Sequence, residues 1–492
     1  MSTPPLYRRW ANHYLHAIQS GALSPGERMP SVRKLMQTHG ISLSTALQVC
    51  RVLEEDGWLE ARPRSGYFVQ LPKRTTVPLD EPSSTRVDPA QFVGIHDRVS
   101  RFILSRRQHP IALNLCGSRG EPDFYPVKAL HKVAQHCLRL YPEVLVSPVA
   151  NSGHSKLRHI LARRSLARGM TLSPDDIVIT HGCTEALNLA LRAVAKPGDT
   201  IAVESPTFYG LLQILESLGM RALEIPTSPQ HGISLDALEL AMQTYDNIRA
   251  VVVIPILQNP LGSLMPDSHK ARLADMCAKA NIPLIEDDTY GELADSPTPA
   301  HTLKAWDRNG NIIYCTSLHK TLAPGMRLGW ISAGRWQARV DMLKHTQTRQ
   351  NEGWSQLAAA EYLGSSAYDR HMHRLKALLR QQRQRTAEVI ARHFPPGTRL
   401  TNPAGGFSLW VELPDRIPSE AVFEAALNEG ILIAPGVLFS NSNRWEHYLR
   451  INCGVRFGAK VEAGLIQLGQ IVHTLLQQSR RTRNSPAVPL AG

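Results

Sequence analysis

The sequence lacks long apolar runs, paired cysteines and an apolar N-terminal segment. No apolar run in its 492 residues approaches the length of a membrane span. The opening MSTPPLYRRW contains no signal-peptide core. The seven cysteines are odd in number and scattered, without a CxxC pair, which is typical of reduced thiols in a reducing compartment. We therefore expect a cytoplasmic protein with no membrane contact and no metal site.

The composition indicates a globular protein with more than one domain. A hydrophobic content of 43% and a charged content of 20% are ordinary for such proteins, and the length suggests at least two hydrophobic cores. The 55 Lys and Arg residues exceed the 42 Asp and Glu residues, which gives a formal charge of +13. This excess fits a polyanionic partner. Because it is spread along the chain, charge alone does not establish nucleic-acid binding.

Residues 1–70 show the pattern of a small α+β domain. Apolar residues recur at helical spacing near the N-terminus. Ser31 can cap a second helix, and Ser42 or Ser44 can cap a third. Two strand-like runs then flank RPRSG, which predicts a β-hairpin with a basic, glycine-containing tip. Helix, turn, helix and hairpin together form a compact reader of duplex DNA.

The segment LYRRWANHYLHAIQSGALSPGERMPSVRKLMQTHGIS resembles the GntR-type winged helix-turn-helix domain through its spaced L-PG-R-PS-R pattern. The resemblance covers nearly all of residues 6–70, includes the wing RPRSGYFV and implies double-stranded DNA as a partner. One departure is that Leu43 follows Ser42, where the family often has an arginine. The alternative is a helical packing domain with an incidental basic hairpin. The DNA contacts implied by the resemblance are Arg28, Ser31, Arg33, Ser44, Thr45, Arg64 and Gly66.

The pattern changes beyond the first domain. Residues 71–91 are rich in Pro, Ser and Thr and have no hydrophobic period, which predicts a linker over 71–110. From 111 to 475, short apolar strands alternate with amphipathic helices, which predicts an α/β domain with a mostly parallel sheet. Residues 345–475 are expected to form a smaller α+β subdomain, and 476–492 a disordered tail.

Three motifs in the second region carry polar groups suited to a ligand. Residues 180–185 follow a strand and open a helix, so glycine and free N–H groups could meet a phosphate. Asp287 ends a strand three residues before Tyr290, a pair that can hold a pyridine nitrogen and reach a phenolic oxygen. Lys320 follows another buried strand, where desolvation can free its amine for Schiff-base formation. Each motif alone could equally be an ordinary turn or surface residue.

Together the motifs resemble the fold-type I aminotransferases, which use pyridoxal 5'-phosphate (PLP), over residues 111–475. The spacing S-x-x-K…PG-x-R-x-G is the most specific part of the match. It implies PLP held as an aldimine on Lys320, with Lys320, Asp287 and Tyr290 as the catalytic residues. The cofactor-binding residues implied are Gly182, Cys183, Thr184, Phe208, Asn259, Asp287, Tyr290, Ser317, Lys320 and Arg327.

The resemblance also concerns the substrate and the partner subunit. It implies that Arg450 holds a substrate α-carboxylate. Phe208 falls where the family stacks an aromatic ring on the cofactor, and Tyr209 is the alternative. Residues 147–153 lack the tyrosine with which many relatives reach the partner subunit's cofactor.

A winged helix, a linker and an aminotransferase-like domain in this order resemble the MocR subfamily of GntR regulators. The resemblance implies a homodimeric transcription regulator that senses PLP, or an amino-acid or amine effector, through the Lys320 aldimine. The alternative is a working PLP-dependent transaminase with a DNA-binding domain, since Asp287, Lys320 and Arg450 are all present. A PLP fold kept only for dimerisation is disfavoured, because Lys320 and the residues implied to hold the cofactor's phosphate are all present.

Overall fold

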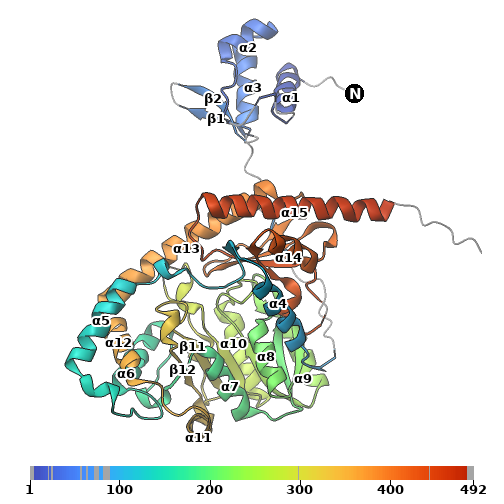
Figure 1. Ribbon diagram of the computed structural model, residues 1–492. Helices are drawn as coiled ribbons and strands as arrows, with labels where there is room; N and C mark the ends of the chain where they lie inside the picture. The colour runs from blue at the N-terminus through green and yellow to red at the C-terminus, as the bar shows by residue number, and fades with distance from the viewer. Residues whose placement is uncertain are drawn as a thin grey trace, which may run out of the picture. The chain divides into compact units, whose positions relative to one another are not determined.

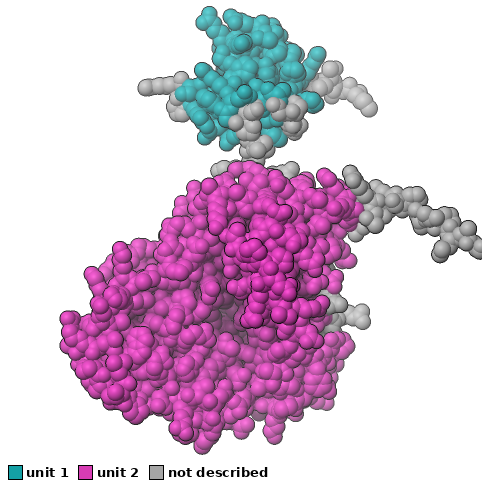
Figure 2. Space-filling view, in the orientation of Figure 1, with its two compact units in different colours: residues 1–75 teal, residues 76–492 magenta. Residues whose placement is uncertain are grey.

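The chain forms two compact units, residues 1–75 and 76–492 (Figures 1 and 2). The computed structural model describes residues 5–19, 22–23, 26–55, 58–62, 65–70, 77–80, 89–296, 298–442 and 444–484. Each unit has a hydrophobic core of its own.

Unit 1 is the predicted winged helix-turn-helix. Ser31 caps the second helix by accepting the Lys34 N–H, and Gly40 ends it in the left-handed conformation, with φ 61°. Ser42, and not Ser44, caps the third helix, because its Oγ accepts the Thr45 N–H at 3.2 Å. The elements are α1 (Leu6–Gln19), α2 (Val32–His39), α3 (Leu43–Glu55) and the antiparallel strands β1 (Leu59–Arg62) and β2 (Gly66–Val69).

Unit 2 is built on a large sheet whose five central strands are parallel, as the alternating pattern predicts. The strand order is β3 (Gln91–Phe92), β7 (Arg221–Ser228), β6 (Thr200–Ser205), β9 (Ile248–Val253), β10 (Leu284–Asp287), β11 (Ile312–Ser317), β12 (Gly329–Ser332) and β5 (Val178–Thr180), with β8 (Gly232–Ile233) paired to β7. The accompanying helices (Figure 1) are α4 (His96–Gln108), α5 (Val127–Leu140), α6 (Ser155–Ser165), α7 (Cys183–Val194), α8 (Tyr209–Ser217), α9 (Leu235–Thr244), α10 (Asp267–Lys279), α11 (Gln337–Gln347) and α12 (Gly353–Leu363).

The predicted smaller subdomain contains an antiparallel sheet in the order β13-β14-β17-β16. Its β17 carries Arg450, which lies opposite Trp410 of β14. At the edge formed by β13, Leu400 donates its N–H to the carbonyl of Val77 at 3.0 Å. The elements are α13 (Ser366–His393), β13 (Arg399–Leu400), β14 (Ser408–Glu412), α14 (Ser419–Asn428), β15 (Ile431–Leu432), β16 (Ala434–Pro435), β17 (Tyr448–Asn452) and α15 (Ala459–Asn484), with β4 (Leu113–Asn114) paired to β15.

Two predicted boundaries differ from the structure. The linker predicted over 71–110 is too long, because β3 joins the large sheet and α4 buries Val99 and Phe102 in the main core. Only these two side chains of the charged α4 are buried, so its apolar pattern is weak. The tail predicted from 476 is also wrong at its start, because α15 continues to 484 and buries Leu476. Residues 71–76, 81–88 and 485–492 lie outside the described residues.

None of the helices in the described ranges is long and apolar enough to span a membrane.

Candidate functional site

One cavity of about 430 Å³ in unit 2 collects the side chains that the motifs single out. It lies where β10 and β11 end, at the carboxyl edge of the parallel strands, which is where ligands bind in open α/β sheets. All ten predicted cofactor residues line it, and so do Arg450 and Tyr209.

One end of the cavity has the groups needed to hold a phosphate. Gly182, with φ 86°, is the residue directly before α7. The free N–H groups at the start of α7 therefore lie at this end of the cavity. Arg327 donates from Nη2 to the carbonyl of His181 at 3.1 Å, and Ser317 lies at the end of β11. A Cβ on Gly329 would lie 2.7 Å from the Gly182 backbone, so only glycine lets β12 approach this loop. Helix N–H groups, a hydroxyl and a guanidinium therefore converge there.

Asp287 is a buried carboxylate that forms no ion pair within the described part of the chain. Its Oδ1 accepts hydrogen bonds from Thr289 Oγ1 at 2.6 Å, Thr289 N at 3.1 Å and Cys183 Sγ at 3.3 Å. Burial raises the pKa of Asp287, while the bonds from Thr289 and Cys183 oppose that rise. A buried carboxylate that forms no ion pair with another described residue fits a ligand that brings a positive charge, such as a protonated pyridine ring.

Lys320 places its amine in the same cavity. Nζ donates to the carbonyl of Ser118 at 2.6 Å and lies 5.3 Å from the centre of the Tyr290 ring. Burial, together with the nearby Arg450 and Arg119, lowers the pKa of Lys320 from 10.5 to about 7. With this pKa, a substantial fraction of the Lys320 amine is neutral near pH 7 and can act as a nucleophile.

The side of the cavity next to Lys320 is bounded by Tyr290, Asn259 and Arg450. Burial raises the pKa of Tyr290 to about 12, so its hydroxyl stays protonated, and Asn259 Nδ2 lies 3.4 Å from it. Arg450 is buried and donates to Asn259 Oδ1 at 2.9 Å and to the Cys116 carbonyl at 2.7 Å. Its Nε has no hydrogen-bond partner among the described residues.

The predicted DNA contacts of unit 1 fall into three places. Arg28 forms a bridge to the wing at Phe68, and its guanidinium lies beside Gly66, which begins β2 with φ 93°. Ser31 and Arg33 belong to the start of α2, whereas Ser44 and Thr45 lie in the first turn of α3. Arg64 lies outside the described residues. Exposed Lys34 and Arg51 were not predicted and add positive charge to α2 and α3.

Comparisons with known proteins agree with both units. The family of bacterial regulatory proteins of the gntR type matches residues 6–69, and aminotransferase class I and II matches residues 119–456. The uncharacterized HTH-type transcriptional regulators YdcR and YjiR of Escherichia coli are each 34% identical to this chain, over 96% of it and 99% of their own length. The chain belongs to the MocR-type GntR regulators.

The fold of this MocR-type chain is also shown by solved structures. The α-aminoadipate aminotransferase LysN of Thermus thermophilus, complexed with N-(5'-phosphopyridoxyl)-L-leucine, is similar with a TM-score of 0.71 at 26% identity. The match covers 77% of this chain and 95% of LysN. Unit 2 thus has the fold-type I aminotransferase fold, which implies dependence on PLP.

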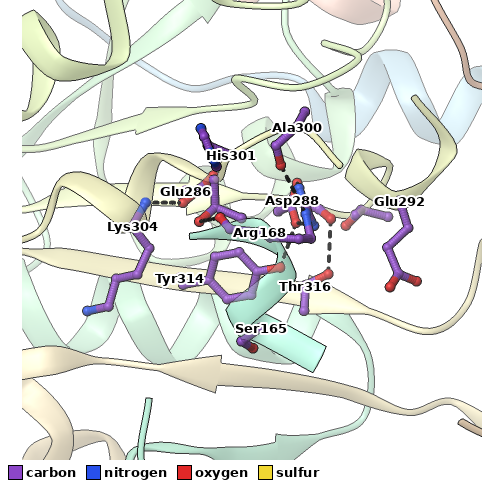
Figure 3. A network of polar contacts seen from close by, with 12 residues as sticks. Ser165, Arg168, Glu286, Asp288, Glu292, Ala300, His301, Lys304, Tyr314 and Thr316 are labelled. Atoms are coloured by element: carbon purple, nitrogen blue, oxygen red, sulfur yellow. Dashed lines mark hydrogen bonds and ion pairs between the residues drawn. The ribbon is translucent and has the colours of Figure 1, made fainter. Parts of the chain in front are cut away.

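Figure 3 shows a buried polar network around Glu286 and Asp288, the residues directly before and after Asp287. Asp288 pairs with Arg168, accepts the Tyr314 hydroxyl at 2.5 Å, and its carbonyl accepts the Thr316 hydroxyl at 3.0 Å. Glu286 accepts the backbone N–H groups of Leu303 and Lys304. Successive strand residues face opposite sides, so this network fixes the end of β10 from which Asp287 enters the cavity.

Sequence reasoning missed three residues that act on the predicted ones. Thr289 orients Asp287, the Ser118 carbonyl holds Lys320, and Arg119 lowers the pKa of Lys320. Thr289 could have been found, because a hydroxyl two residues after a carboxylate often bonds to it. Ser118 acts through its backbone, for which there is no sequence signal.

Proposed function

We propose that this MocR-type regulator binds PLP in the 430 Å³ cavity, and that DNA binding by unit 1 responds to PLP or to an amino-acid or amine effector there. The observation that carries the proposal concerns Lys320, whose amine has a pKa lowered to about 7. This amine shares the cavity with Asp287 and with the groups suited to binding a phosphate. The PLP dependence implied by the fold and the phosphopyridoxyl ligand of LysN support this. The cytoplasmic location stays a prediction.

The residues present fit PLP in size and charge. The N-terminus of α7, with Thr184, Ser317 and Arg327, would hold the phosphate. Ionised Asp287 would hold the proton on the ring nitrogen, and Tyr290 and Asn259 would donate toward the phenolic oxygen. PLP supplies an aldehyde that condenses with amines and a ring that withdraws electrons. Phe208 or Tyr209 would cover the ring face.

The remaining groups act on the effector. The Lys320 nitrogen would accept a proton from an incoming ammonium group, which would leave the effector's amine as a neutral nucleophile in the cavity. Arg450 can turn its guanidinium to a carboxylate and hold it with two hydrogen bonds. Arg450 belongs to the smaller subdomain, whereas Lys320 follows a strand of the large sheet. An amino acid would therefore contact both parts of unit 2.

A homodimer forms part of the proposal. Unit 2 has an apolar groove of about 890 Å³, lined in part by Leu130, Met326 and Trp354. Apolar side chains on and just after α5 are exposed: Val127, Leu140, Tyr141, Leu145 and Val146. An exposed apolar surface of this kind fits a second copy of the chain. Two winged helices per dimer would then read repeated half-sites in double-stranded DNA.

An active transaminase is the second candidate function, because Asp287, Lys320 and Arg450 all line the one cavity. The relative 2-aminoadipate transaminase of Thermus thermophilus is 27% identical over 76% of this chain. One experiment separates the two functions. The full chain is titrated with amino acids and amines, and visible absorbance, keto-acid release and affinity for DNA from upstream of its own and neighbouring genes are followed together.

A regulator is expected to change its absorbance and its DNA affinity without turnover. Stoichiometric or continuing keto-acid release with unchanged DNA affinity would favour the transaminase instead. An Arg450→Met variant should lose its response to amino acids while keeping that to amines without a carboxylate, because only the former use the guanidinium. Absence of binding to all these fragments at moderate salt would contradict the regulator.

The lowered pKa of Lys320 predicts how the cofactor-free protein captures PLP. Only the neutral amine attacks an aldehyde, so the rate should rise with pH and level off above a midpoint near pH 7. Stopped-flow absorbance across a pH series measures this rate, with N-acetyl-lysine as the control, whose rate should still be rising above about pH 9. The same continued rise in the protein would show that Lys320 is not perturbed.

A further inference from the structure

Two leucines on α3 are exposed to solvent. The core side of this helix is formed by Ala46, Val49 and Cys50, which are fully buried. Leu43 and Leu47 remain 54% and 42% exposed, and neither belongs to the hydrophobic core of unit 1. Residues four apart lie on the same face of a helix, so the two side chains form one apolar surface.

The surroundings of this leucine pair are polar and positively charged. Arg51 lies one turn beyond Leu47 on the same face, and Ser44 is exposed beside Leu43. No acidic residue occurs from Met29 to Leu53, whereas this stretch contains Arg33, Lys34 and Arg51. A second copy of the same face would bring like charges together, which disfavours self-association here. Cations around a small apolar surface match the phosphates and the floor of a DNA major groove.

We propose that Leu43 and Leu47 recognise the C5-methyl groups of thymines in the major groove. Leucine side chains cannot read the hydrogen-bond donors and acceptors of base edges. The thymine methyl is the apolar feature that the major groove presents, and apolar side chains contact it. Residues near the N-terminus of a recognition helix are those that reach base edges. The preferred half-site therefore contains thymines opposite the first two turns of α3. This inference rests on DNA binding by unit 1.

The test uses deoxyuridine, which differs from thymidine by the missing methyl group. Duplexes that bind the full chain are first selected from a random pool, and each thymine of the enriched half-site is then replaced by deoxyuridine. At the contacted positions, affinity of the unaltered protein should fall about fourfold for each methyl removed. Leu43→Ala and Leu47→Ala should each become insensitive to deoxyuridine at one of these positions. Leu6→Ala, at a leucine 52% exposed on α1, is the control and should keep the full pattern.

The outcomes separate this inference from the proposed function. Enriched DNA whose binding is unaffected by deoxyuridine everywhere would overturn the role of the leucines and leave DNA binding intact. A deoxyuridine effect that persists unchanged in both leucine variants would also overturn it. If no sequence is enriched at moderate salt, DNA reading by unit 1 fails, and the leucine assignment with it. The deoxyuridine series on the unaltered protein does not depend on how the variants fold.

Discussion

Replacing Lys320 with alanine will abolish the visible absorption band that PLP gives when it is covalently bound to the protein. Lys320 is the only lysine among the described residues that line the cavity, so no other amine there can form the link. The groups that would bind the cofactor's phosphate, among them Gly182 and Arg327, remain in this variant. PLP should therefore still bind, but more weakly and reversibly. Absorbance spectra after addition of PLP, followed by gel filtration, measure both effects.

Lys279→Ala is the matched control, because Lys279 is exposed on α10 and its ion pair among the described residues is with Asp275. This variant should keep the band. A Lys320→Ala protein that retains the band after gel filtration would contradict the assignment of the site. If it loses the band but its DNA affinity still responds fully to ligands, the covalent link is not part of sensing.

Replacing Arg168 with leucine is expected to lower the free energy of unfolding of unit 2 by about 3–5 kcal/mol. Arg168 is buried and pairs with the fully buried carboxylate of Asp288 (Figure 3). Removing the guanidinium leaves that charge with the Tyr314 hydroxyl as its remaining side-chain donor among the described residues. Urea-induced unfolding of the full chain, followed by tryptophan fluorescence, gives the shift in midpoint.

Two further variants show whether the buried charge causes the loss. Arg272→Ala removes an exposed arginine that pairs with Asp236 and Glu239, and should hardly move the midpoint. The double variant Arg168→Leu with Asp288→Asn should recover part of the loss, because no uncompensated charge stays buried. A single Arg168→Leu variant as stable as the unaltered protein would contradict the inferred role of the ion pair.

The cofactor residues could be predicted because their chemistry is written in short motifs. Asp287 and Tyr290 are three residues apart, and Lys320, Ser317 and Arg327 lie within one segment. Residues this close in sequence stay near one another wherever their segment lies in the fold. Arg119 and the Ser118 carbonyl reach Lys320 only because a loop about two hundred residues earlier folds over the cavity. No local pattern marks a contact of that kind.

Strand β7 is difficult to predict from the sequence for a different reason. Strand β7 contains Glu224, Pro226 and Thr227 among its apolar residues, so it lacks the continuous apolar run of its neighbours. Glu224 is nevertheless buried, because the hydroxyls of Ser205, Ser440 and Ser442 donate to it. These partners come from two distant parts of the chain. Tertiary hydrogen bonds thus decide a strand that local apolarity does not indicate.

The hydrogen bond between Val77 and Leu400 joins the beginning of unit 2 to the sheet of the smaller subdomain. Strand β13, which holds Val77, is joined through β14 to β17, which carries Arg450. Val77 is also the first described residue after the stretch that leads out of unit 1. In the proposed function, a ligand that drew Arg450 toward the large sheet would therefore pull on β17, which is hydrogen-bonded through β14 to β13 and so to Val77.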